Sequence, residues 1–254
     1  MPLEIDLSGR TALVTGAGRG IGKSIALQLG SCGARVAVHY GTSESPAREI
    51  AQQIGNGSFA IKADLASADA CLSLFDDVVE KAGRVDVLVN NAGIALSAPL
   101  DSSADQWIKA WDDQMAVNAR SAGILSYQAV KHFVEHGGGR IIHISSRAAF
   151  RGDAGDSWAY AASKSALLGL NGTIARAYGK QGVKSFVIAP GWTLTEMAQA
   201  FIDEHGDEQV LGEISLDRLT RPEDIAPMVA LLASGLADHA TGTSIDMNAG
   251  SYVH

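Results

Sequence analysis

At 254 residues, with 46% hydrophobic and 19% charged residues, the chain has the size and composition of a globular protein with a substantial core. This composition excludes a disordered or collagen-like chain. The formal net charge of −8 argues against a general nucleic-acid binder, which would present a basic face, and it gives no attraction to an anionic membrane.

The two cysteines, Cys32 and Cys71, are too few for a disulfide scaffold and fit a reducing compartment. Cys32 lies in an apolar helical pattern and is interpreted as a small buried hydrophobe. The first residues lack a secretory signal, and no apolar run approaches the roughly 20 residues of a membrane span. We therefore expect a soluble, cytoplasmic protein without a membrane segment.

Short β-branched runs alternate with helical patterns from one end of the chain to the other. The expected strands are 11–15, 35–39, 58–62, 85–89, 140–144, 183–188 and 243–247. The expected helices are 20–31, 46–54, 68–82, 104–135, 157–178 and 222–233.

The runs at 85–89 and 141–144 are nearly all apolar, which favours a sheet covered on both faces. Strand–helix alternation predicts a parallel sheet with right-handed crossovers, that is, a doubly wound, Rossmann-like α/β fold. No linker or composition shift marks a second unit, so residues 1–254 are expected to form a single domain. In such a fold, ligands bind beyond the carboxyl ends of the strands.

A glycine-rich turn follows the first expected strand and opens a helix. Its spacing is G-x-x-x-G-x-G rather than the usual G-x-G-x-x-G, but glycines here still let the backbone approach a pyrophosphate at a helix N-terminus. A strand-to-helix turn needs glycine in any case, so the pattern alone is weak. The expected cofactor-binding residues of this turn are Gly16, Gly18, Arg19, Gly20, Ile21 and Gly22.

The end of the second expected strand bears on the choice of dinucleotide. An NAD site places an acid there to bind the ribose hydroxyls, but residues 39–43 include no acid, and the first acid after them is Glu44. Tyr40, in this stretch, is an expected cofactor-binding residue. Arg19 lies inside the glycine turn, where a 2′-phosphate would sit. These features predict NADP(H), with NAD(H) as the less favoured cofactor; the alternative is that Arg19 is a solvated loop charge.

Tyr160 and Lys164 are four residues apart in a helical pattern and share one helix face. A free phenol has a pKa near 10, and a neighbouring ammonium group lowers it, which makes proton exchange with a carbonyl or alcohol feasible. Such a pair is often merely structural, so its value as evidence for catalysis depends on the motifs found elsewhere in the chain.

With these motifs in order, the chain resembles the short-chain dehydrogenase/reductase family. The resemblance runs from Thr11 to about Gly250 and rests on the TGxxxGxG turn, Asp64-Leu65, the Asn90-Asn91-Ala92-Gly93 stretch, Asn118, Ser146, the YxxxK pair Tyr160 and Lys164, and Pro190-Gly191. Their joint occurrence in this order is far more specific than any single motif.

The resemblance implies four catalytic residues. Tyr160 would exchange the proton, Lys164 would lower its pKa and hold the nicotinamide ribose, Ser146 would bind the substrate oxygen, and Asn118 would anchor a water relay to Lys164. It also implies that Tyr160 and Lys164 contact the cofactor, together with Asp64, Leu65, Asn91, Ala92, Gly93, Pro190, Gly191, Thr193 and Thr195. Asp64 would bind the adenine, and Thr195 would offer a hydroxyl to the carboxamide. Each of these residues also has a structural interpretation as a turn, cap or helix-bend residue.

The chain departs from the family pattern in two places. The stretch from Ser146 to Tyr160 is one residue longer than the pattern, which leaves Ser145 as an alternative to Ser146; we favour Ser146. The segment Asp246-Met247-Asn248-Ala249-Gly250 replaces the usual Asp-Gly-Gly ending, a change expected to affect packing more than chemistry.

Two segments should border the substrate. Arg147 and Arg151 follow the serine and could pair with a carboxylate or phosphate of the substrate; the alternative is that they form ion pairs with acids of their own loop or make subunit contacts. Residues 194–216 resemble the family's variable lid, with Phe201, Ile202 and Val210 as candidate wall residues.

The favoured substrate is a small polar ketone, sugar or polyol. The alternative, a 3-oxoacyl group on acyl carrier protein, requires a basic docking patch that this acidic chain does not suggest. Two alternatives of other classes are a non-catalytic dinucleotide sensor and a lyase or epimerase on the same fold. The resemblance also implies a homotetramer, and no metal-ligand spacing is found.

Overall fold

The computed structural model describes residues 4–253 and contains one seven-stranded sheet in which every strand is parallel to its neighbours. The strand order is β3-β2-β1-β4-β5-β6-β7, so the chain reverses its winding direction between β1 and β4. The strands are β1 (Thr11–Val14), β2 (Arg35–Tyr40), β3 (Phe59–Lys62), β4 (Val87–Asn90), β5 (Gly139–Ile144), β6 (Val183–Pro190) and β7 (Ser244–Met247). The doubly wound α/β expectation is confirmed.

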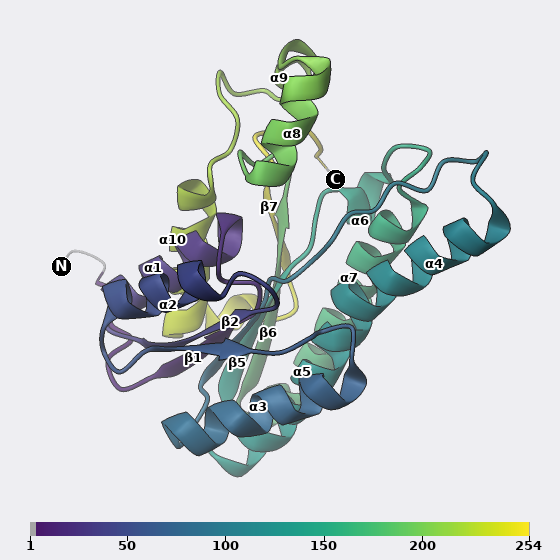
Figure 1. Cartoon of the computed structure of the whole chain (residues 1–254). Coiled ribbons are helices and arrows are strands. Elements are labelled where there is room, and N and C mark those ends of the chain that lie inside the picture. The colour runs from purple at the N-terminus through teal and green to yellow at the C-terminus, as the bar shows by residue number, and fades with distance from the viewer. Residues whose placement is uncertain (1–3, 254) are drawn as a thin grey trace.

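Helices cover both faces of this sheet (Figure 1). One layer holds α1 (Gly20–Ser31), α2 (Glu44–Ile54) and α10 (Pro222–Ser234); the other holds α3 (Ala68–Ala82), α5 (Ser121–Glu135) and α7 (Trp158–Tyr178). Successive strand residues feed opposite layers: Val14 packs under the first layer and Leu13 under the second. This alternation explains why the strands read as continuous apolar runs.

The helix expected over 104–135 is interrupted. It consists of α4 (Ala104–Gln114), a π-helical turn at Met115–Arg120 and then α5. The interruption escaped the sequence pattern because apolar residues continue through it. Its consequence is local: the turn places Asn118 in the buried interior.

Three short helices were also not expected. They are α6 (Ala148–Arg151), α8 (Glu196–His205) and α9 (Glu208–Gly212), and the last two stand beyond the end of the sheet above β7 (Figure 1). The expectation that Cys32 is a buried residue of the helix is also wrong, because Cys32 follows the last turn of α1 and is only partly buried. In the described part of the chain, no helix is both long and apolar enough to cross a membrane.

Candidate active site

The glycine turn between β1 and α1 is packed too tightly for side chains. A Cβ atom on Gly22 would lie 2.4 Å from the Gly16 carbonyl oxygen and 2.5 Å from the Asn91 amide nitrogen. Gly16 has a φ of +62°, and its Cβ would lie 3.0 Å from the Ala92 Cα. The turn therefore lies directly against the loop that follows β4.

Hydrogen bonds hold these two loops together. The backbone N–H groups of Asn91 and Ala92 donate to the Thr15 hydroxyl over 2.9 and 3.0 Å, and the Asn91 side chain donates to the Thr15 carbonyl over 2.8 Å. Asn91 and Ala92 thus shape the glycine turn from the side, and Asn91 acts here through its side chain as well as its backbone.

His39 supports the same turn and was not predicted as a site residue. Its Nδ1 accepts from the Gly16 N–H over 3.0 Å, and its Nε2 lies 3.2 Å from the Ala63 carbonyl oxygen, to which it donates in this tautomer. Burial lowers the pKa of His39 to about 4, so the imidazole is neutral and keeps its acceptor. A buried histidine ending the strand beside the glycine turn was the available signal.

The residues expected around the adenosine half of a dinucleotide lie at the ends of β2 and β3. Tyr40 is buried, and a Cβ on Gly18 would lie 3.2 Å from the Ser43 Cβ, so the turn after β2 packs on the glycine turn. Asp64 is exposed, and its carboxylate accepts from the Ala66 N–H over 2.9 Å, while Leu65 is buried.

Arg19 projects from the glycine turn and pairs with Glu196 of α8 over 2.6 Å, with both side chains largely exposed. Next to it, the methyl group of Thr195 lies against Gly20, and its hydroxyl accepts from the Ala198 N–H over 3.4 Å as the N-cap of α8. The start of the 194–216 segment therefore rests on the glycine turn.

Ser146 and Tyr160 meet at the end of β5. The Ser146 hydroxyl hydrogen-bonds the Tyr160 phenol and accepts from the Ala148 N–H over 3.1 Å. Ser145 points elsewhere, because its buried hydroxyl donates to the Lys164 carbonyl over 2.8 Å. Of the two candidate serines, the structure brings only Ser146 to the tyrosine.

The pKa of Tyr160 differs from the expectation. Burial raises it above its ordinary value, and the Ser146 hydrogen bond only partly opposes this rise. Lys164 lies beside the ring, with its Nζ 5.7 Å from the ring centroid, and donates to the Ile144 carbonyl over 2.9 Å. The expected lowering by Lys164 is therefore not seen in this arrangement, in which the ammonium group faces the ring and a backbone oxygen.

Lys164 is itself buried, which lowers its pKa to about 8. A Cβ on Gly93 would lie 3.2 Å from the Lys164 Nζ and 3.5 Å from the Asn118 Oδ1. The loop after β4 thus contacts the glycine turn through Ala92 and Lys164 through Gly93, which makes one continuous surface from the turn to the tyrosine.

Asn118 fixes this loop from behind. Its amide accepts from and donates to the backbone of Ile94, each over 2.8 Å, and donates to the Ser163 hydroxyl over 3.0 Å. Its side chain therefore positions the loop beside Lys164 and makes no direct bond to the lysine.

The residues that follow β6 lie on the side of the candidate site opposite the loop after β4. Gly191 packs on Asn248 so closely that a Cβ would lie 2.9 Å from the Asn248 Cα, and the Pro190 carbonyl accepts from the Arg147 N–H over 2.9 Å. The buried Thr193 hydroxyl donates to the Gly191 carbonyl over 3.1 Å. Arg147 and Arg151 both pair with Glu213 of the 194–216 segment and not with an acid of their own loop.

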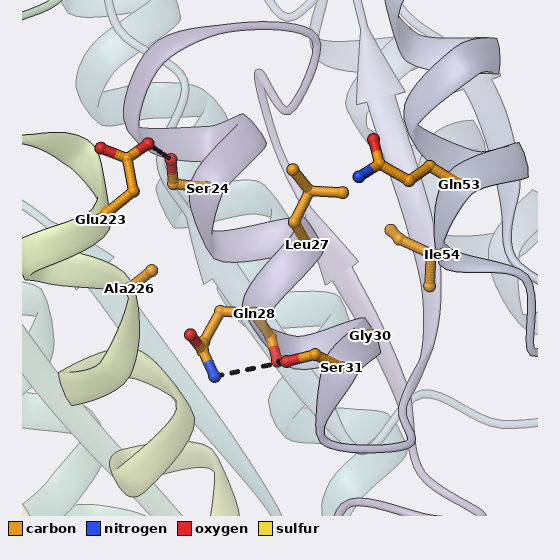
Figure 2. Close-up of a pocket in the computed structure, with 9 residues that line it drawn as sticks. All are labelled: Ser24, Leu27, Gln28, Gly30, Ser31, Gln53, Ile54, Glu223 and Ala226. Carbon is orange, nitrogen blue, oxygen red and sulfur yellow. Dashed lines mark hydrogen bonds between the residues drawn. The ribbon is translucent and has the colours of Figure 1, made fainter.

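A surface pocket of about 400 Å³ lies apart from this site, between α1, α2 and α10 (Figure 2). Ser24 and Glu223 are hydrogen-bonded across one end of it, 2.8 Å apart, and none of the predicted site residues lines it. The described residues hold no group of three or more potential metal-ligating side chains. Of the expected wall residues, Val210 is buried and Ile202 partly buried, and the Phe201 side chain lies outside the described ones.

Comparison with known proteins finds a family model, a curated relative and solved structures that match nearly the whole chain. A family model described as enoyl-(acyl carrier protein) reductase matches residues 16–252. The 3-oxoacyl-(acyl-carrier-protein) reductase FabG of Staphylococcus aureus is 38% identical over 247 residues, which cover 96% of this chain and 98% of the relative.

Two solved structures with bound NADP share the fold. A proposed NAD(P)-dependent gluconate 5-dehydrogenase from Beutenbergia cavernae superposes with a TM-score of 0.90 at 34% identity, covering 98% of this chain and 99% of the other. The angucycline C-6 ketoreductase LanV superposes with a TM-score of 0.86 at 36% identity, covering 97% and 96%.

Proposed function

Because the chain belongs to the short-chain dehydrogenase/reductase family, we propose that it is an NADP(H)-dependent oxidoreductase acting on a carbonyl or secondary alcohol. The observation that carries the proposal is the continuous surface from Gly16 through Ala92 and Gly93 to Lys164 and Tyr160. It joins a candidate phosphate-binding turn to a candidate proton donor.

The glycine turn fits a dinucleotide. Gly16 and Gly22 leave room for backbone alone, and the turn opens α1, whose N-terminus favours a phosphate. Arg19 would meet the 2′-phosphate, and Asp64 would bind the adenine. The NADP bound by the two solved relatives supports this choice of cofactor. When bound, NADPH supplies the hydride.

Residues of the chain itself would bind and protonate the substrate's carbonyl oxygen. Ser146 and Tyr160 would both bind the carbonyl oxygen, where negative charge develops, and the Tyr160 hydroxyl would give it a proton. Lys164 would hold the ribose, and Asn118 would keep the loop at Gly93 in place. Pro190, Gly191, Thr193 and Thr195 would line the nicotinamide side.

For the substrate we favour a small polar ketone, sugar or polyol. The arginines near the opening are matched by acids: Arg19 by Glu196, and Arg147 and Arg151 by Glu213. This pairing leaves little positive surface for an acidic carrier protein. The second candidate, 3-oxoacyl-(acyl-carrier-protein) reduction, is favoured by the full-length similarity to FabG.

One assay separates these candidates. Purified protein is given NADPH with a panel of small ketones and keto sugars, and separately with a 3-oxoacyl thioester on acyl carrier protein and on a short thiol. Faster NADPH consumption with small ketones supports the first proposal. A strong preference for the carrier-bound thioester over the free one overturns it in favour of the second.

We also propose a homotetramer in the cytoplasm. The large apolar side chains of Ile108, Tyr127 and Trp158 are each at least half exposed on α4, α5 and α7, which supports subunit contacts through these helices. The unpaired thiols Cys32 and Cys71 suit a reducing compartment. Sedimentation equilibrium tests the tetramer, and cell fractionation tests the cytoplasmic location.

A further inference from the structure

Residues 194–216 leave the body of the protein through a narrow base. Thr193 pairs with Thr220 as an isolated β-bridge, and the Leu194 N–H donates to the Thr220 carbonyl over 2.8 Å. Between these points the chain carries α8 and α9 beyond the end of the sheet (Figure 1). Near the C-terminal end of the segment, the Ser215 N–H also donates to the Ala249 carbonyl over 2.8 Å, and side-chain contacts add to these backbone bonds.

Glu213, just after α9, makes such a contact with both loops that flank the active site. Its Oε2 accepts from Arg147 of the loop after β5 and, over 3.1 Å, from the Trp192 indole of the loop after β6. Arg151 adds a third, longer contact of 3.5 Å. Although partial burial would raise the pKa of Glu213, the bonds from Arg147 and Trp192 hold it below its usual range.

Arg147 depends on this carboxylate. Its guanidinium is buried, lies 5.8 Å from the centroid of the Trp192 ring and has one nitrogen, Nη1, with no partner. A buried cation needs a nearby anion, and Glu213 supplies it. The backbone of Arg147 follows Ser146 directly and donates to Pro190, so a shift of Arg147 reaches both the serine and the nicotinamide side.

We propose that Glu213 is a positioning residue of the reaction, which latches the 194–216 segment across the loops carrying Ser146 and Pro190. The inference rests on the proposed carbonyl chemistry. The unpaired Nη1 leaves room for a second bond to the same carboxylate, so a small inward movement of the segment would make the pair bidentate. The latch would thereby couple closure of the segment to placement of the serine.

The test replaces the carboxylate by its amide, Glu213→Gln, with Glu208→Gln on the same segment as the matched control, because Glu208 is exposed. We expect Glu213→Gln to raise KM for a neutral ketone about 10-fold or more, which is the range of a lost charge-assisted bond, and to speed proteolytic cleavage within residues 194–216. Glu213→Asp should restore part of both effects, and Glu208→Gln should change neither.

Three results would overturn the latch: unchanged KM and cleavage, a lowered melting temperature without either change, or a raised KM for a keto acid alone. The last result would assign Arg147 to a substrate carboxylate. If no carbonyl compound is reduced by the wild-type protein, the proposed function fails, whereas the cleavage rates still report on the latch.

Discussion

At the scale of single residues, the proposed reaction depends on the Tyr160 phenol, which would stay protonated until a carbonyl oxygen takes its proton. Burial raises the pKa of Tyr160, and the hydrogen bond from Ser146 moderates that rise. The acid form therefore dominates at neutral pH, which suits the direction of carbonyl reduction. Alcohol oxidation requires the phenolate and should gain from alkaline pH.

Replacing Tyr160 by phenylalanine removes the proton and keeps the ring. We expect kcat for ketone reduction to fall about 10²- to 10⁴-fold, the usual contribution of general acid catalysis, while the affinity for NADPH changes far less. Turnover assays measure kcat, and fluorescence titration measures the affinity for NADPH. Tyr127→Phe on the exposed face of α5 is the matched control; near-normal turnover of the Tyr160 variant would refute its role.

The buried ammonium group of Lys164 predicts a pH limit. Its pKa is lowered to about 8, so the cation is present below this pH and lost above it. Because the cation would hold the cofactor ribose beside Tyr160, kcat/KM for reduction should decline as the pH rises through about 8. A Lys164→Arg variant that retains activity should keep its charge and move the decline upward. A profile that rises through this range would contradict the assignment.

At the scale of elements, the glycine turn carries an exposed arginine that is already paired. The Arg19–Glu196 bridge has both side chains about 70% exposed, and such pairs contribute about 0.2–1 kcal/mol. A 2′-phosphate offers more oxygens and more charge, so it should displace the carboxylate.

Arg19→Ala should therefore weaken NADPH binding about 10- to 100-fold and NADH binding little, as measured by titration of nicotinamide fluorescence. Glu196→Gln should leave NADPH binding equal or slightly tighter, because it removes a competitor. If Arg19→Ala weakened the binding of NADPH and NADH equally, Arg19 would shape the turn and would not recognise the 2′-phosphate.

The turn after β7 holds a strained residue. Ala249 has a φ of +55°, in the left-handed region that favours glycine, and it stands where the family pattern has glycine. Ala249→Gly relieves that strain and also makes the unfolded chain more flexible, so we expect a net stabilisation of about 0.5–1 kcal/mol. Urea unfolding of the two proteins measures it; a loss of stability would mean that the Ala249 methyl group packs usefully.

At the scale of the whole molecule, the sequence predicted the architecture well because most strands, such as β1 and β4, are apolar runs between helical patterns. All seven strands lie within two residues of their expected ends. The clearest shift is at β4, where Val85 donates its N–H to the His132 ring and does not join the sheet. The grouping of Ser146, Tyr160 and Lys164 followed from the family resemblance, whereas their hydrogen bonds did not.

The features that the sequence did not predict depend on contacts between segments far apart in the chain. The π-helical turn at Asn118 leaves the apolar pattern unbroken, so nothing local reveals it. No pattern says which of 28 acids will meet Arg147, and Glu213 is far from it in the chain. The lowered pKa of Lys164 and the raised pKa of Tyr160 likewise require knowledge of burial, which the YxxxK spacing does not contain.

The two most deeply buried histidines, His39 and His143, make the stability of the folded protein depend on pH. Burial lowers the pKa of His39 to about 4 and of His143 to about 3, whereas an unfolded histidine titrates near 6.5. Below about pH 6.5 these two histidines are therefore protonated in the unfolded chain but stay neutral in the folded chain until the pH approaches their lowered pKa values. The free energy of unfolding should fall by up to ~1.4 kcal/mol per pH unit for each histidine until its folded pKa is reached.

Urea unfolding between neutral pH and about pH 4 tests this dependence. His39→Asn keeps an acceptor near the Nδ1 position, where the Gly16 N–H donates, but removes the titrating group, so its stability should fall less steeply with acid than that of the wild type. His239→Asn, at an exposed position, should leave the slope unchanged. If all three proteins lose stability at the same rate, carboxylates and not buried imidazoles govern acid unfolding, and the neutral His39 that orders the glycine turn would have no stability signature.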